Sequence, residues 1–145
     1  MRTVWDDFRI GSSRLGAMRQ ISADDILIHA KETGDFYPHH MDAEWCATQP
    51  FRKRIAHGTL VFSIAVGSIA EDINEAAMSY GYDKVRFIAP VFIDDSIQAY
   101  AEILGKREHL KKPENYGFID ESVIVTNQKG DTVMAFTHIY LVDKK

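Results

Sequence analysis

The stretch TLVFSIAVGSIA, residues 59–70, contains no charged side chain and is the most apolar part of the 145-residue chain. An apolar run on every face of a helix indicates a helix that is buried on nearly all sides. We predict that this helix begins at His57-Gly58, continues through residues 71–75 and ends near Tyr80-Gly81. The rest of the domain is then expected to wrap around it.

A shorter helix and a long loop precede the apolar stretch. Ser22, followed by Asp24 and Asp25, is typical of an N-cap with acidic residues in the first helical turn, and this helix is expected to end near Thr33-Gly34. Residues 34–57 show no regular period. A loop of this length in a small domain is either functional or disordered, and its four aromatic residues argue against disorder.

The residues after the central helix are predicted to form antiparallel strands. Val85–Ile88 is a short β-rich run, and Ser96–Glu102 alternates apolar and polar residues with the period of a half-buried strand. Residues 118–127 and 132–142 flank a hairpin turn signal. The order predicts an α+β fold in which a long central helix is wrapped by an antiparallel sheet of about five strands. Without repeats or linkers, we expect one domain over residues 1–145.

Composition excludes several classes of function. The formal charge is −4, so the electrostatic footprint of a duplex-binding protein is missing. Cys46 is the only cysteine, which rules out an internal disulfide and fits a reducing compartment. The first residues lack the apolar segment of a signal peptide, and no apolar run approaches a membrane span of about 18 residues. We expect a soluble cytoplasmic protein that binds neither nucleic acid nor membrane.

Two motifs carry the information on function. The first is Thr33-Gly34-Asp35-Phe36-Tyr37-Pro38-His39-His40, and the second is Arg54-Ile55-Ala56-His57-Gly58 ahead of the apolar stretch. Together they resemble the MaoC-like dehydratase family, which includes the R-specific enoyl-CoA hydratases of the hotdog fold. The family pattern is approximately TGD-x-NP-x-H, followed by R-I-A-H-G-x-L. The resemblance covers roughly residues 20–142, and it departs from the pattern at Tyr37 and His39.

The resemblance implies that Asp35 and His40 are the catalytic pair. Hydration of an α,β-unsaturated thioester needs a base that activates water for attack at Cβ and an acid that protonates Cα, and an Asp–His pair can share these roles. Five residues across a proline-containing turn allow the two side chains to meet. The alternative is that Asp35 caps a turn and His40 is a partly buried structural histidine.

The resemblance also implies roles at the start of the central helix. The backbone N–H of Gly58 would face the thioester oxygen, where a helix N-terminus stabilises negative charge. Ser63 would assist, although a helix serine can equally bond to a preceding carbonyl. For His57 we favour a structural role that shapes the loop, within the substrate-binding region. Tyr37 and His39 are expected to face or flank the pocket, and Arg54 and Arg86 are candidates for the phosphates of an acyl-CoA substrate.

Other chemistries are weighed against this prediction. Histidines, Asp42 and Cys46 crowd residues 39–57, but adjacent histidines usually point apart and no recognised zinc spacing is present, so we expect no metal and no cofactor. The rivals are a hotdog acyl-CoA thioesterase and a non-catalytic acyl-CoA-binding subunit. The fold further implies a homodimer or a dimer of dimers, which would cover exposed strand edges.

Overall fold

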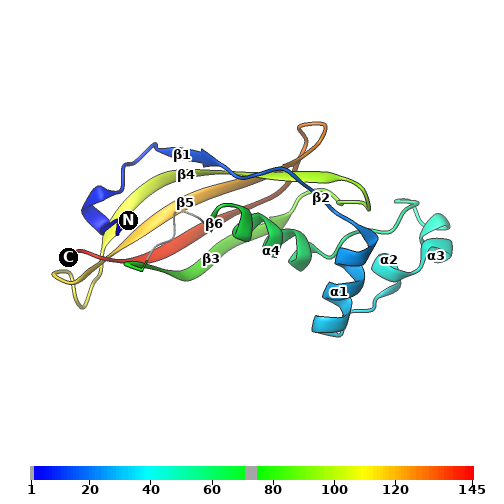
Figure 1. Ribbon diagram of the computed structural model, residues 1–145, viewed down its shortest axis with the longest axis horizontal. Coiled ribbons are helices and arrows are strands. Elements are labelled where there is room, and N and C mark those ends of the chain that lie inside the picture. The colour runs from blue at the N-terminus through cyan, green and yellow to red at the C-terminus, as the bar shows by residue number, and fades with distance from the viewer. Residues whose placement is uncertain (1, 71–74) are drawn as a thin grey trace.

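A six-stranded antiparallel sheet forms the body of the computed structural model, which describes residues 2–70 and 75–145 (Figure 1). The strands are β1 (Ser13–Leu15), β2 (Arg19–Gln20), β3 (Ala77–Phe87), β4 (Ser96–Glu108), β5 (Tyr116–Asn127) and β6 (Thr132–Asp143). Their order across the sheet is β1-β4-β5-β6-β3, and β2 also pairs with β4. The antiparallel sheet and the β5–β6 hairpin are confirmed, while the two short N-terminal strands were not predicted.

The helices lie against one face of the sheet and at both of its ends (Figure 1). They are η1 (Trp5–Asp7), α1 (Ala23–Thr33), α2 (Pro38–Met41), α3 (Ala43–Ala47) and α4 (Gly58–Ser68). The prediction of α1 is confirmed at both ends, because the Ser22 side chain caps it and Gly34 closes it in a left-handed conformation. The loop predicted over residues 34–57 contains the two short helices α2 and α3. No helix in the described part of the chain is long and apolar enough to cross a membrane.

The central helix is shorter than predicted. Helix α4 ends at Ser68, and Tyr80-Gly81, the predicted end, lies inside strand β3. Residues 71–74 of the predicted helix lie outside the described residues. The prediction that this helix is buried on nearly all sides was also wrong, because Ser63 and Gly67 are exposed along one side of α4. Apolar composition identified the helix but carried no stop signal, since its C-cap is Ile69 instead of glycine.

Alternation along the long strands directs one face of the sheet onto α4. In β4 the side chains of Ile97, Ala99 and Ala101 are buried, and in β5 those of Val123 and Val125 are buried. These residues pack with the buried side of α4 in the main hydrophobic core. The helix therefore lies across the inner face of the sheet with its N-terminus near the end of the sheet where α1, α2 and α3 are found (Figure 1).

Strand β3 forms one edge of the sheet and is irregular. Its register against β6 shifts between Ser79 and Gly81 and again between Asp83 and Arg86, and Lys84 has a positive φ of 54°. Each bulge changes the face of the sheet toward which the following side chains point. The strand therefore lacks a regular alternation of buried and exposed residues. This explains why the predicted run, Val85–Ile88, covers only the end of β3.

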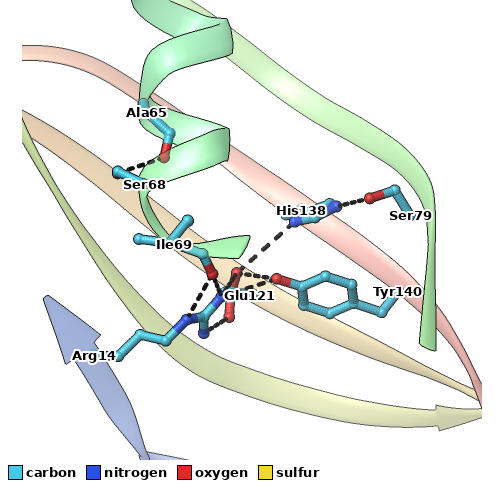
Figure 2. Close-up of polar contacts among 8 residues, drawn as sticks. All are labelled: Arg14, Ala65, Ser68, Ile69, Ser79, Glu121, His138 and Tyr140. Carbon is cyan, nitrogen blue, oxygen red and sulfur yellow. Dashed lines mark hydrogen bonds and ion pairs between the residues drawn. The ribbon is translucent and has the colours of Figure 1, made fainter. Parts of the chain in front are cut away.

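A buried polar network fills the inner face of the sheet beyond the C-terminal end of α4 (Figure 2). The fully buried Glu121 carboxylate accepts hydrogen bonds from the Arg14 guanidinium and, at 2.7 Å, from the Tyr140 hydroxyl. Arg14 also donates to the carbonyl of Ile69. Burial raises the pKa of Glu121, but contacts with His138, Arg14 and Tyr140 outweigh it and hold that pKa below its usual value. The network thus anchors the end of α4 to the sheet.

Candidate functional site

The turn after α1 determines where Asp35 lies. Gly34 takes a left-handed conformation with φ of 81°, and its N–H donates to the carbonyl of Ala30. One carboxylate oxygen of Asp35 accepts from the N–H of Tyr37 at 3.3 Å, and Pro38 then starts α2. Asp35 therefore does cap a turn, as the alternative reading stated. Its second carboxylate oxygen is not used in that turn and lies opposite His40.

His40, on α2, presents one ring nitrogen to Asp35. Its Nδ1 lies 2.7 Å from the carbonyl oxygen of Ile55, which can only accept, so Nδ1 carries the proton of the neutral ring. The bare Nε2 lies 3.8 Å from Oδ2 of Asp35. Burial lowers the pKa of His40 and the proximity of His57 lowers it further, against opposing contributions from the Ile55 carbonyl and Asp35. The neutral ring with a bare Nε2 is the form in which a histidine accepts a proton.

The segment that leads into α4 is held by main-chain contacts from two sides. Ile55 forms a β-bridge with Phe92, and the N–H of Ala56 donates to the carbonyl of Val91 at 2.7 Å. Arg54 donates from Nε to the carbonyl oxygen of His40 at 2.6 Å. Residues 54–56 are therefore fixed to α2 on one side and to the sheet on the other. This arrangement brings the start of α4 next to His40.

A cavity of about 240 Å³ lies against both His40 and Gly58. The remaining walls are mainly aliphatic and come from the segment that leads into α4, the first turn of α4, the segment after β3 and the start of β6. These residues are Ile55, Ala56, Val61, Ile88, Ala89, Pro90, Val91, Val133 and Met134. Phe87 also lines it and is 60% exposed, so its apolar side chain belongs to the site and not to the core. The Phe87 ring lies so close to Gly58 that a Cβ at that position would come within 2.7 to 2.9 Å of three of its atoms.

The other predicted site residues lie around this cavity without lining it. Tyr37 is 61% exposed and stacks on His39, whose ring packs against Trp45 and Phe51. Ser63 is exposed on α4, and its hydroxyl donates to the carbonyl of Thr59.

Arg86 and His57, also predicted to belong to the substrate-binding region, differ in burial. Arg86 is exposed on β3, next to Phe87 at the cavity. His57 is buried and stacks on His40, with ring centroids 3.9 Å apart. The fold therefore brings Asp35, His40, His57 and Gly58 together and leaves Arg86 on the surface.

Asp35, His40 and His57 form the cluster that most resembles a metal site in the described part of the chain. One potential ligand atom from each lies within 4.8 Å of the others. The two imidazoles are stacked with an interplanar angle of 23°, however, so their lone pairs run side by side and do not converge. In addition, Nε2 of His57 is hydrogen-bonded to the main-chain oxygen of Asp35 at 2.9 Å. The arrangement fits proton transfer better than metal binding.

Sequence reasoning missed two residues at the site. Phe87 lies in the β-rich run Val85–Ile88, where an apolar side chain favours a core position. It is exposed because β3 lies at the edge of the sheet. His29 comes from α1, and its Nε2 lies 2.8 Å from the hydroxyl of Thr59, while its ring meets His57 edge-on. A histidine inside an amphipathic helix carries no functional signal of its own. Both residues were therefore recognisable only once the elements were placed.

Comparisons with known proteins show the family of this chain. The model of the MaoC like domain matches residues 8–121. Protein MaoC of Klebsiella aerogenes is 32% identical over 111 residues, which are 76% of this chain and 32% of that protein. The (R)-specific enoyl-CoA hydratase of Aeromonas caviae is 29% identical over 90 residues, 62% of this chain and 67% of the hydratase. This chain thus spans about a third of the Klebsiella protein and two thirds of the hydratase.

Solved structures show the same fold. A monoamine oxidase regulatory protein from Archaeoglobus fulgius superposes with a TM-score of 0.92 at 33% identity, covering 99% of this chain and 96% of that one. A double hotdog protein from Mycobacterium tuberculosis superposes with a TM-score of 0.86 at 19% identity, covering 99% of this chain and 45% of that one. The fold is a hotdog, and the chain belongs to the MaoC-like domain family.

Proposed function

We propose that this chain is an enoyl-CoA hydratase, acting in reverse as a 3-hydroxyacyl-CoA dehydratase. The observation that carries the proposal is the 3.8 Å approach of Asp35 Oδ2 to His40 Nε2, where His40 shares a cavity with the start of α4. Family membership supports it, because relatives bear the names (R)-specific enoyl-CoA hydratase and 3-hydroxybutyryl-CoA dehydratase. By analogy with the former we propose the R-configured 3-hydroxyacyl product.

In the proposed mechanism Asp35 and His40 hold one water molecule between them. Their separation is too long for a direct hydrogen bond, so a water that contacts both is the natural way to satisfy the two atoms. His40, whose Nε2 is bare, takes a proton from the water as the water oxygen bonds to Cβ, and the proton that the pair then holds is delivered to Cα. The hydroxyl and the proton of one water end on the substrate, and the pair returns to its starting protonation state.

The start of α4 is proposed to stabilise the enolate-like thioester oxygen. Gly58 is the first residue of the helix, so its N–H has no acceptor within the helix and lies at the positive end of the helix dipole. Gly58 also lines the cavity, which places this N–H beside the space that the substrate would occupy. Removing a donor of this type usually costs about 100-fold to 1,000-fold in kcat.

Substrate binding is proposed to involve the remaining residues of the two motifs. Arg86 is exposed beside Phe87 at the cavity; its Nη1 donates to the carbonyl of Val85, and its other N–H groups are proposed to meet a phosphate group of an acyl-CoA. Arg54 is occupied by the His40 carbonyl, so its proposed contribution is mainly to hold α2. Tyr37 and His39 stack at the side of the site where α2 begins. No cofactor enters the proposed reaction.

A homodimer, or a dimer of dimers, is proposed as the working form. Strand β3 pairs only with β6 among the described strands and therefore leaves one edge unpaired. Four large apolar side chains on or directly after this strand are more than half exposed: Met78, Tyr80, Phe87 and Ile88. Pairing of two such edges would cover them. Sedimentation velocity that gives the mass of one 16.5 kDa chain would contradict this proposal.

The experiment that tests the function follows loss of the enoyl-thioester absorbance, beginning with crotonyl-CoA. Asp35→Asn is compared with wild type and with Asp24→Asn, a matched control on the exposed first turn of α1. We expect wild type and the control to hydrate the substrate equally, and Asp35→Asn to lose about a hundredfold or more, as for loss of a general acid–base group.

Two further readouts on the same variants test the rival functions, which are an acyl-CoA thioesterase and a non-catalytic acyl-CoA-binding subunit. Release of free thiol would identify a thioesterase. Binding of acyl-CoA without turnover, unchanged by Asp35→Asn, would identify a binding subunit. Either outcome would overturn the proposed reaction.

A further inference from the structure

His57 is fully buried at the site and contacts both members of the proposed catalytic pair. It is 1% exposed and occupies the N-cap position of α4. One face of its ring lies parallel to His40, with centroids 3.9 Å apart, and His29 meets the ring edge-on at 4.8 Å. The ring therefore forms a wall behind His40 and limits its rotation.

The hydrogen bond of His57 determines its tautomer. Nε2 lies 2.9 Å from the main-chain oxygen of Asp35, and because a carbonyl only accepts, Nε2 carries a proton. Nδ1 is buried and has no hydrogen-bond partner among the described residues. A proton on Nδ1 would be a buried donor without an acceptor, which is costly. The geometry therefore places a proton on Nε2, which donates to the main-chain oxygen of Asp35.

We infer that His57 is a positioning residue that fixes the backbone of Asp35 and the ring of His40 relative to each other. This inference rests on the proposed function. The two catalytic side chains come from opposite ends of the Asp35–His40 turn, and the contacts of His57 join both of them to the start of α4. One side chain would thus align the acid–base pair with Gly58, the next residue in the chain.

The environment of His40 is compatible with this role. Besides His57, the ionisable groups near His40 are Asp35, His39 and His29, while Arg54 contacts its carbonyl oxygen. His40 is anchored by one hydrogen bond, to Ile55, which leaves rotation about that bond to be limited by packing. The stacked ring of His57 provides that packing. Loss of the ring or of the donor should therefore misplace the pair without removing either catalytic group.

The test compares His57→Leu, which loses the donor and the ring, with His57→Gln, whose amide N–H can replace Nε2–H. His109→Leu, a histidine on the distant β4–β5 connection, is the matched control. We expect a fall in kcat of about a hundredfold for His57→Leu, the usual cost of a displacement near 1 Å, with KM within about threefold of wild type. We expect His57→Gln to recover most of that loss. A kcat near wild type in His57→Leu, or equal losses in both variants, would overturn the inference.

A second measurement does not depend on turnover. Side-chain ¹⁵N spectra of the imidazoles near pH 7 are expected to show a proton on Nε2 of His57 and a proton on Nδ1 of His40, both as assigned from their acceptors. A His57 ring without a proton on Nε2 would contradict the inference. Inactivity of the wild-type protein toward every enoyl thioester would instead count against the proposed function and leave this spectrum to decide on His57.

Discussion

Replacing Gly58 with alanine should separate activity from stability. A Cβ at this position would lie 2.7 to 2.9 Å from three atoms of the Phe87 ring, whereas carbon atoms in contact prefer about 3.5 to 4.0 Å. The ring or the helix start must therefore move by roughly 1 Å. Phe87 lies on an edge strand whose proposed pairing with a second copy would cover its ring, so the helix start is expected to take up part of this movement.

The two consequences differ in size. Alanine favours helix over glycine by up to about 1 kcal/mol, which offsets the cost of moving the ring, so we expect Tm to change by only a few degrees. A shift of about 1 Å at the proposed oxyanion donor should lower kcat/KM by about a hundredfold. Crotonyl-CoA hydration and thermal unfolding of the same preparations measure both quantities.

The double variant Gly58→Ala with Phe87→Ala tests the cause. Removing the ring opens the space that the new methyl group needs, so we expect the double variant to be more active than Gly58→Ala alone. Phe87→Ala by itself is the control for the loss of a cavity wall. The reasoning is refuted if Gly58→Ala keeps full activity, or if removal of the ring brings no recovery.

Three further predictions concern residues outside the cavity lining. Arg14→Met should lower the free energy of unfolding in urea by about 3 to 5 kcal/mol, because it leaves the buried Glu121 carboxylate without its cation. The folded state holds the pKa of Glu121 below its usual 4.5, so this carboxylate stabilises the fold above pH 4.5 and loses that effect as the pH falls further. Glu121→Gln should therefore reduce the dependence of the free energy of unfolding on pH in the acid range. Burial raises the pKa of the Cys46 thiol, so a thiol reagent should modify it far more slowly in folded than in urea-unfolded protein.

The sequence was informative where function depends on neighbours in the chain. Asp35, His40 and Gly58 lie in two short motifs, and the turn chemistry of Gly34 and Pro38 is local, so their approach was predictable. Helix α1 was predictable for the same reason, because its caps are encoded within a few residues of its ends.

Long-range contacts were not predictable in this way. Arg14 and Glu121 are 107 positions apart, and nothing in either local sequence indicates that they meet. Most of strand β3 was missed because its bulges interrupt the alternation on which strand prediction depends. The exposure of Phe87 follows from the place of β3 at the edge of the sheet, which is a property of the whole topology.

The length of α4 has a consequence for how the molecule can change over evolutionary time. Eleven helical residues extend about 16 Å, whereas a strand of twelve extends about 40 Å, so the helix covers less than half of the sheet. The remaining half has a separate core, in which Trp5 and Phe8 pack on Ile119 and Val142. Arg14 of the polar network bonds both to Ile69 of the main core and to Tyr140 of this second core. Substitutions in one core should therefore be accepted largely without regard to the other. The end of the sheet that carries Trp5 is free to diverge between relatives while the end that carries Asp35 and His40 keeps its chemistry.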